Sequence, residues 1–183
     1  MQRPEPRNEE IVLDPKRYIV SKTDASGVIN YANDYFIEVS GYTERELIGQ
    51  PHNIIRHPDM PKLMYKMLWE ALKSGKEFKL IMKNLSKDGR FYWVVASFET
   101  NRHARTDEIL GYTAYRKAIE KHVVEKIAPI YKRLCNYEQV NGVSASERYF
   151  TEILNEKKMV YAQFVEDMLS HDGISKLFKK MFH

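Results

Sequence analysis

The chain has 183 residues, of which 29 are Lys or Arg and 25 are Asp or Glu, so its formal net charge is +4. Acids and bases are interleaved along it, which argues against a nucleic-acid partner and indicates an ordinary solvated surface. The single cysteine, Cys135, excludes intrachain disulfides and multi-cysteine metal sites. No uncharged apolar run reaches the ~18 residues of a transmembrane helix. The N-terminal residues are polar and lack the apolar region of a signal peptide. We therefore predict a cytoplasmic protein without a membrane span.

The chain begins with a polar segment and a short hairpin. Residues 1–15 are polar and charged and are expected to form a flexible leader. The β-branched residues at 17–23 and 28–32 predict two strands. The turn residues DASG at 24–27 join them, so the two strands are expected to pair as a hairpin.

Helical segments follow the hairpin. Apolar residues at helical spacing over 34–40 predict a short helix, and TERE at 43–46 has the pattern of a capping box for a second one. A charged loop, Ile55–Leu63, comes next, and its two prolines restrict the backbone. The second proline suits the first turn of a helix over 61–74, and the glycine after that helix suits its C-terminal cap.

Three strands complete the predicted domain. Residues 78–84, 91–100 and 109–115 have strand character, and Asp88-Gly89 is a strong hairpin turn signal. Both faces of 91–100 are apolar, so this strand is expected to be central and covered on both sides. The first two strands must join these three. We therefore predict an α+β domain over residues 16–117 whose helices cover one face of the sheet.

Residues 118–183 are predicted to form a helical signalling or docking region. An apolar stripe over 123–134 indicates a helix that an internal proline should kink. Residues 136–143 are expected to be a linker, and SASE at 144–147 has the pattern of another capping box. The apolar positions beyond it follow a roughly heptad spacing: Phe150, Ile153, Val160, Phe164 and Met168. They predict helices that either pack on the first domain or form a dimerisation or partner-docking surface.

The loop Ile55–Leu63 concentrates polar groups on a rigid backbone, which is a common setting for a binding site. Arg56 can hold a phosphate or carboxylate through its bidentate fork. Asp59 can orient Arg56 or His57, or accept a hydrogen bond from a ribose hydroxyl. Each residue also has a plain structural interpretation, since Arg56 and Asp59 can form a local ion pair and His57 can cap a turn.

Several segments resemble those of PAS domains. The generic ones are YAND at 31–34, VSGY at 39–42, ELIG at 46–49 and the run from KDG to YWV at 87–94. The long run GQPHNIIRHPDMP, Gly49 to Pro61, is more specific and closely resembles the sensor domains of Aer-type aerotaxis receptors. The resemblance covers about Ile19 to Arg116 and implies a PAS fold, a five-stranded antiparallel sheet with a ligand cleft between sheet and helices, followed by C-terminal helices.

In the Aer-like family this cleft holds non-covalently bound FAD, whose redox state reports respiratory electron flow. The resemblance therefore implies FAD as the cofactor and assigns the cofactor-binding role to seven residues: Asn33, Arg56, His57, Asp59, Trp69, Phe78 and Asn84. Their chemistry agrees with this role. The amide of Asn84 both donates and accepts, which suits the edge of an isoalloxazine ring, and Trp69 can wall the pocket by stacking.

The chain departs from the family pattern in two respects. Phe78 stands where the family has Trp, which keeps an aromatic face but removes an N–H donor, and Lys79 and Leu80 replace small residues. Aer-type receptors also continue into membrane-spanning and signalling regions, whereas no apolar span follows here. The resemblance thus implies a bipartite, CetB-like arrangement for energy taxis. In this arrangement, a PAS protein without a transmembrane segment acts through a membrane-bound methyl-accepting-type transducer and so lies at the inner face of the membrane. A homodimer, formed through the PAS domain or the C-terminal helices, is a further option.

Other functions compete with the flavin sensor. A haem-binding PAS sensor needs an axial ligand, and His52 and His57 precede the predicted 61–74 helix rather than lying on it. A cysteinyl–flavin photosensor is disfavoured because Cys135 lies beyond the predicted sheet. His52, His57 and Asp59 offer metal ligands without a clear fourth, and few catalytic groups converge, so we expect no enzyme. A ligand-free PAS interaction module stays open.

Overall fold

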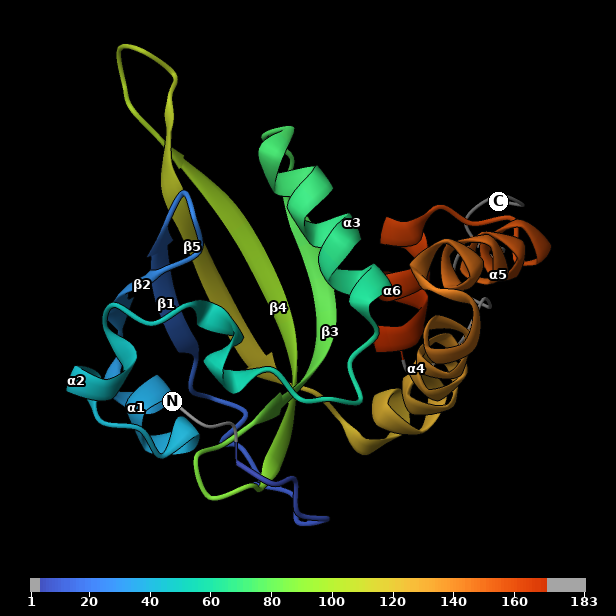
Figure 1. Ribbon diagram of the computed structural model, residues 1–183, viewed down its shortest axis with the longest axis horizontal. Coiled ribbons are helices and arrows are strands. Elements are labelled where there is room, and N and C mark those ends of the chain that lie inside the picture. The colour runs from blue at the N-terminus through green and yellow to red at the C-terminus, as the bar shows by residue number, and fades with distance from the viewer. Residues whose placement is uncertain (1–3, 171–183) are drawn as a thin grey trace, which may run out of the picture. The chain divides into compact units, whose positions relative to one another are not determined.

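The computed structural model describes residues 4–170. The chain divides into two compact units, which are described separately here. The first unit comprises the residues up to Met60 together with Met64–Ala118, and the second comprises Pro61–Leu63 together with the residues from Ile119 onward. Figure 1 shows the strands and helices of both.

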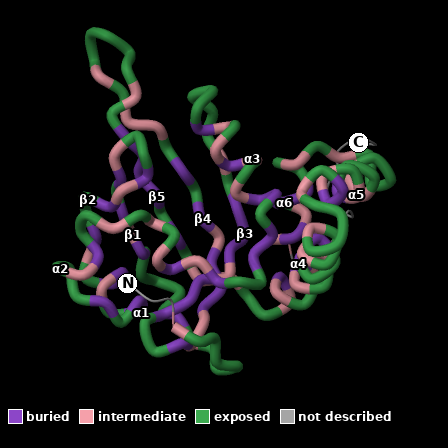
Figure 2. Tube along the Cα trace, in the orientation of Figure 1, coloured by how far each residue is buried: buried purple, intermediate pink, exposed green. Residues whose placement is uncertain are grey.

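The first unit contains the expected five-stranded antiparallel sheet. Its strands are β1 (Ile19–Asp24), β2 (Ile29–Ala32), β3 (Phe78–Leu85), β4 (Phe91–Arg102) and β5 (Ile109–Ala118). They lie in the order β2-β1-β5-β4-β3, so β5 occupies the centre, although the sequence placed the β4 segment there. The β4 strand is nevertheless interior, because it pairs with β5 on one side and β3 on the other. Its buried residues lie between Tyr92 and Phe98, whereas the strand from Glu99 onward is intermediate or exposed (Figure 2).

The register of the sheet gathers polar residues on one face. Paired residues of neighbouring antiparallel strands point to the same side of a sheet. Ser21 pairs with Ala114, and Ile19 pairs with Arg116, so the inward face of β1 and β5 carries Ser21 and Arg116 together. Asn84 of β3 pairs with a buried tyrosine of β4 on that same face. The sheet thus contributes a polar floor beneath the helices.

The helices of the first unit lie between β2 and β3 in the sequence and in front of the sheet in Figure 1. They are α1 (Asp34–Ser40), α2 (Glu44–Leu47), a 3-10 turn η1 (His52–Ile55) and α3 (Lys62–Lys73). The predicted capping box at the start of α2 is confirmed, since Thr43 and Glu46 bond each other's backbone N–H. Gly75 follows α3 with a φ of 69°, a left-handed conformation that favours glycine after a helix.

The polar segment before Pro15, expected to be a flexible leader, is instead paired along the β3–β4 hairpin. The N–H of Arg7 donates to the carbonyl of Gly89, and the N–H of Ile11 donates to that of Phe91, both at 2.7 Å. Phe91 returns a bond from its N–H to the carbonyl of Glu9 at 3.0 Å. The sequence missed this pairing because main-chain hydrogen bonds need no apolar side-chain pattern.

The second unit consists of α4 (Lys121–Asn141), α5 (Val143–Glu156) and α6 (Tyr161–Leu169). The linker predicted at 136–143 is wrong, because α4 continues to Asn141 and Gly142 alone, with a φ of 77°, separates it from α5. The capping box predicted at 144–147 is also wrong, since α5 already begins at Val143 and has no side-chain cap. The cause is that one glycine ends the first helix and lets the next begin without a linker.

The three helices bury apolar side chains against one another. Phe150 of α5 lies edge-on to Phe164 of α6, with ring centroids 5.3 Å apart. Tyr137 of α4 stacks on Tyr149 of α5 at 4.6 Å. Of the predicted heptad positions, Phe164 is buried whereas Val160, which precedes α6, is 64% exposed. The spacing therefore describes two short helices rather than one continuous stripe.

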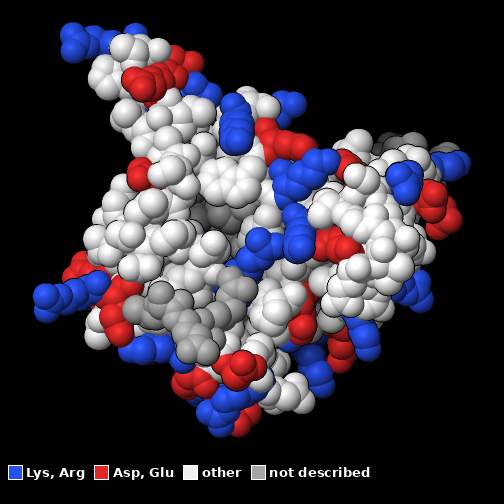
Figure 3. Space-filling model, in the orientation of Figure 1, with Lys and Arg blue, Asp and Glu red and all other residues white. Residues whose placement is uncertain are grey.

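Two expectations about the surface can be compared with the structure. None of the helices within residues 4–170 combines the length and the apolar character needed to cross a bilayer. On the face drawn in Figure 3, the basic and acidic side chains of the described residues are interspersed, as the sequence predicted.

Candidate functional site

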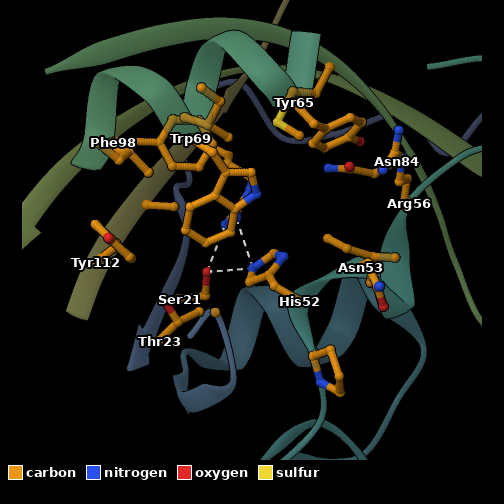
Figure 4. Close-up of a pocket in the computed structure, with 18 of the residues that line it drawn as sticks. Ser21, Thr23, His52, Asn53, Arg56, Tyr65, Trp69, Asn84, Phe98 and Tyr112 are labelled. Atoms are coloured by element: carbon orange, nitrogen blue, oxygen red, sulfur yellow. Dashed lines mark hydrogen bonds between the residues drawn. The ribbon is translucent and has the colours of Figure 1, made fainter. Parts of the chain in front are cut away.

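A cavity lies between the sheet and the helices of the first unit. It contains about 930 Å³ of space not filled by protein atoms, a volume that includes the open solvent at its mouth. Strands β1, β3, β4 and β5 form its floor, while η1 and α3 form its opposite wall. Figure 4 shows its aromatic lining of Tyr65, Trp69, Phe98 and Tyr112.

Trp69 forms one wall of the cavity. It projects from α3, and its ring meets that of Tyr112 edge-on with centroids 5.5 Å apart. Gly27, in the turn between β1 and β2, allows this position: a Cβ there would lie 3.1 Å from Cη2 of Trp69, and the φ of Gly27 is +87°. Glycine is therefore needed twice over, for the backbone conformation and for the close approach of the indole.

Asn84 projects into the cavity from β3 and is 1% exposed. Neither its amide nitrogen nor its amide oxygen has a hydrogen-bond partner in the structure. The hydroxyl of Tyr92, directly across the strand pair, lies near enough to the Asn84 side chain for the two groups to interact, but the geometry between them is not that of a hydrogen bond. A buried unpaired amide is unfavourable by about 1–3 kcal/mol, so this side chain is suited to a ligand that both accepts and donates.

A second polar group on the cavity floor consists of Ser21, His52 and Arg116, here called the pocket cluster. Arg116 donates from Nη1 to Ser21 Oγ at 3.0 Å and from Nη2 to His52 Nε2 at 2.9 Å. Ser21 Oγ lies 2.9 Å from the same His52 nitrogen, as the dashed lines of Figure 4 mark. Arginine can only donate, so His52 Nε2 is an acceptor and the ring proton sits on Nδ1.

The charge state of the pocket cluster follows from its surroundings. Desolvation, together with the adjacent Arg116 charge, lowers the pKa of His52 to about 3, so this ring is neutral near pH 7 although part of it faces the cavity. Burial lowers the pKa of Arg116 to about 10, which leaves its guanidinium charged. The cluster as a whole therefore carries one positive charge on the cavity floor.

Arg56 brings a second cation to the cavity from the loop Ile55–Leu63. Its backbone forms an isolated antiparallel bridge with Asn84, so this loop lies against the third strand. The guanidinium lies 3.7 Å from the centroid of the Tyr65 ring, a cation–π contact that fixes its position. Unlike Arg116, Arg56 is only partly buried.

His57, Asp59 and Lys83, here called the loop cluster, do not line the cavity. Asp59 Oδ2 lies 2.7 Å from Lys83 Nζ and 3.5 Å from His57 Nδ1. Desolvation acts to raise the pKa of Asp59, but the Lys83 hydrogen bond and charge outweigh it and leave that pKa below its usual value. Burial and then the Lys83 charge lower the pKa of His57 to about 4. The cluster fastens the loop to β3 on the side away from Asn84.

The structure thus brings three of the seven predicted cofactor residues into one cavity: Arg56, Trp69 and Asn84. Asn33 caps α1 instead, since its Oδ1 accepts from the N–H groups of Val20 and Phe36 at 3.0 Å each. Phe78 pairs with the cavity residue Phe98 on β4 but lies outside the lining. His57 and Asp59 belong to the loop cluster described above.

Most residues of the cavity lining were not predicted as ligand contacts, and His52 and Arg116 are the most important of these. His52 was considered only as a metal or haem ligand, and Arg116 was not considered at all. A signal for Arg116 was present, because strand alternation places it on the same face as Tyr112 and Ala114, where a charged side chain is unusual. Within residues 4–170, no group of three His, Cys, Asp or Glu side chains could hold a metal ion, so the weighed His52–His57–Asp59 site is not formed.

Residues 29–116 match the sequence profile described as PAS fold. A solved light-oxygen-voltage domain, studied with a flavin analogue, superposes with a TM-score of 0.54 at 16% identity and covers 63% of this chain and 86% of its own. The light-state structure of the Aureochrome1 light-oxygen-voltage domain gives a TM-score of 0.51 at 17% identity, covering 69% of this chain and 93% of its own. The first unit therefore has the PAS fold.

Two curated bacterial proteins are similar in sequence to part of this chain. The aerotaxis receptor of Escherichia coli K12 is 42% identical over 116 residues, which cover 63% of this chain and 22% of the receptor. The biofilm dispersion protein BdlA of Pseudomonas aeruginosa is 30% identical over 80 residues, covering 43% of this chain and 19% of that protein. The chain thus spans about a fifth of the length of each of these relatives, and the PAS domain resembles the sensor region of the receptor.

Proposed function

We propose that this chain is a cytoplasmic sensor of redox or energy state that binds FAD in its PAS cavity. The observation that carries the proposal is Asn84, whose buried amide is unpaired on both atoms inside the cavity between the sheet and the helices. A ligand edge that both donates and accepts would satisfy it, and the isoalloxazine ring has such an edge. The 42% identity to an aerotaxis receptor supports taxis as the process served.

The residues present fit a flavin dinucleotide. Trp69 would cover a face of the ring by stacking, and Asn84 would bond its polar edge. Arg56, partly exposed and held by Tyr65, would take a phosphate through its guanidinium fork. When bound, the flavin supplies reversible electron uptake. The chain's own part is to orient the ring, to exclude water from it and to register its change of charge and hydrogen bonding.

A haem ligand fits this cavity less well. Axial ligation requires a free imidazole nitrogen directed at the iron. His52 lines the cavity, but its Nε2 already accepts from Arg116 and contacts Ser21. His57 has Nδ1 engaged with the Asp59 backbone N–H at 3.1 Å and lies outside the lining. Flavin is therefore the ligand that we propose.

A photosensor that bonds its flavin to cysteine would need a thiol in the cavity lining, and Cys135 lies in α4, outside that lining. A ligand-free scaffold would leave the Asn84 amide permanently unpaired, which is unfavourable. Catalysis would need convergent groups of matched pKa, and we propose a sensor rather than an enzyme.

For the output, we propose a membrane-bound methyl-accepting-type transducer as the partner. Helices α4, α5 and α6 would provide the docking or dimerisation surface, with exposed Val140 and Val160 available for contact. The protein would then sit at the inner face of the membrane through this partner. Co-purification of the chain with a taxis transducer, lost when the helices are disrupted and retained when the cavity is altered, would support this assignment.

The experiment that tests the cofactor is an absorption spectrum of the purified full chain, before and after dithionite, with chromatographic identification of the released chromophore. We expect an oxidised flavin spectrum that bleaches on reduction, and release of FAD. Asn84→Ala should lose the flavin, whereas the matched control Asn101→Ala, at an amide that bonds Thr113 instead, should keep it. A Soret band, or no uptake of added FAD, would contradict the proposal.

A further inference from the structure

Arg116 is a buried cation whose charge is not matched by an acid. Its side chain is 1% exposed, yet its pKa of about 10 keeps it charged. Its hydrogen bonds go to Ser21 and His52, which are both neutral, and its Nε has no partner. Among residues 4–170, no carboxylate forms an ion pair with it.

Such an arrangement is unfavourable unless a negative charge lies beside the guanidinium. A buried charge is stabilised by an opposite charge, and neutral hydrogen bonds orient it without neutralising it. The rings of Phe36 and Phe98 flank the guanidinium at 5.8 and 6.0 Å, so its surroundings are largely apolar. An apolar setting also strengthens the attraction of Arg116 for any negative charge that enters the cavity.

A flavin dinucleotide has two kinds of group that can carry this charge, its phosphates and its ring. Phosphates are strongly hydrated and suit a cation at a water-facing position, which Arg56 provides on its loop. Arg116 instead stands on the sheet floor beside Ala114, fully buried and among aromatic rings. Such a floor suits the apolar ring system rather than the phosphates.

We propose that Arg116, held by Ser21 and His52, is the counter-ion for the negative charge that the flavin ring gains on taking up one electron. The inference rests on the proposed function and adds how the cavity sets the redox response. One electron passes from an external reductant, dithionite in the test below, to the ring. No bond breaks and no proton is taken up, so the ring gains one negative charge. Arg116 favours this unprotonated, singly reduced form over the oxidised form.

The test uses the full chain loaded with FAD and four variants. Arg116→Met removes the charge, and Arg116→Lys keeps it. Ser21→Asp supplies an internal carboxylate where Ser21 Oγ now stands, 3.0 Å from Arg116 Nη1, and so neutralises the guanidinium without removing it. Ser21→Asn is its uncharged control, and Arg90→Met, at an exposed arginine paired with Asp88, controls for net charge.

The readouts are the midpoint potential of the first electron and the spectrum of the singly reduced protein. We expect the wild type to accumulate the anionic form. In Arg116→Met the reduced form should bind at least about tenfold more weakly relative to the oxidised form, which lowers a one-electron midpoint by about 59 mV. Ser21→Asp should shift it in the same direction and further than its uncharged control Ser21→Asn does. Arg116→Lys should recover most of the loss seen in Arg116→Met, while Arg90→Met should stay near the wild type.

The outcomes separate this inference from the proposed function. If the wild type binds no flavin, the proposed function and this inference are both contradicted. If it binds FAD but the midpoint and reduced spectrum are the same in Arg116→Met and in Ser21→Asp, the inference alone is overturned. If Arg116→Met does not fold, the Ser21→Asp and Ser21→Asn pair decides. Titration with riboflavin, which lacks phosphate, is the final arm: weaker binding of FAD but unchanged binding of riboflavin in Arg116→Met would assign Arg116 to phosphate and overturn the ring assignment.

Discussion

The loop cluster and the pocket cluster each contain a histidine and a basic side chain, yet the positive charge is neutralised in only one of them. In the loop cluster the Lys83 charge meets the Asp59 carboxylate at 2.7 Å. In the pocket cluster Arg116 meets only a hydroxyl and a neutral imidazole. The first arrangement is complete in itself and holds a loop in place. The second is incomplete, which is the property expected of a site that awaits a ligand.

The largest effect on the stability of the folded chain is expected from acid, because both clusters contain a histidine that acid can protonate. Their folded pKa values, about 3 for His52 and about 4 for His57, lie below the ordinary 6.5. The unfolded chain therefore binds more protons as the pH falls below 6.5, and stability is lost toward pH 4. The slope is at most about 1.4 kcal/mol per pH unit for each proton.

Urea unfolding of the flavin-free chain between pH 4 and pH 7 measures this slope. His57→Gln should remove the contribution of the loop cluster, and His52→Gln that of the pocket cluster. Asp88 and Glu46, with pKa values lowered to about 2, lose their contributions only below about pH 4.5 and so do not obscure this window. Constant stability from pH 7 to pH 4 would show that neither histidine is held neutral.

The next largest effect should come from Arg116→Met in the flavin-free protein. Replacing a buried charge that lacks a counter-ion by an apolar side chain of similar length is expected to raise the free energy of unfolding by about 1–4 kcal/mol. Ser21 and His52 can still bond each other at 2.9 Å after the change. Chemical denaturation checks this prediction. A marked loss of stability would mean that the pocket cluster is a structural support like the loop cluster.

Asn84→Leu should sharpen the contrast between paired and unpaired polar groups. Because the Asn84 amide is buried without partners, an apolar residue of similar size should raise the free energy of unfolding of the flavin-free chain by about 1–2 kcal/mol. Asn101→Leu should lower it by about 1 kcal/mol, since Asn101 bonds buried Thr113 at 3.0 Å. Thermal and urea unfolding compare the two. Equal destabilisation by both changes would contradict the idea of an unpaired amide.

The smallest effect should come from Asp59→Asn in the loop cluster. The Asp59 carboxylate is 64% exposed, and ion pairs of exposed groups contribute about 0–1 kcal/mol because solvent screens them. We expect a loss of about 0.5 kcal/mol in the free energy of unfolding, measured at pH 7 in low salt, and a smaller loss in high salt. A loss several times larger would mean that the loop depends on this carboxylate.

Much of the fold could be predicted because its signals are local. The turn at 24–27, the Thr43–Glu46 capping box and the Asp88-Gly89 hairpin each act within a few residues, and all predicted strands are present. The order of the strands is not local, and the sequence placed the fourth strand where the fifth lies. The end of α4 was missed for a different reason, since Gly142 alone separates α4 from α5 where the sequence predicted a linker.

The candidate site was less predictable than the fold. The sequence indicates which residue types can bind a flavin, but only the strand register shows which ones share a face. Asn84 and Arg56 were singled out and do meet, joined by a backbone bridge. Arg116 was missed because its relation to Ser21 and His52 depends on pairing across about a hundred residues of sequence, which no local pattern carries.

The close approach of Trp69 to Gly27 gives the cavity its own optical reporter. The chain has two tryptophans, and the other, Trp93, pairs with Lys83 and points to the opposite side of the sheet from Asn84. Trp93→Phe would therefore leave a single indole, on the cavity wall, whose emission is sensitive to whatever fills the space beside it. Ligand entry could then be followed by fluorescence quenching in real time, without a label and independently of the ligand's own colour.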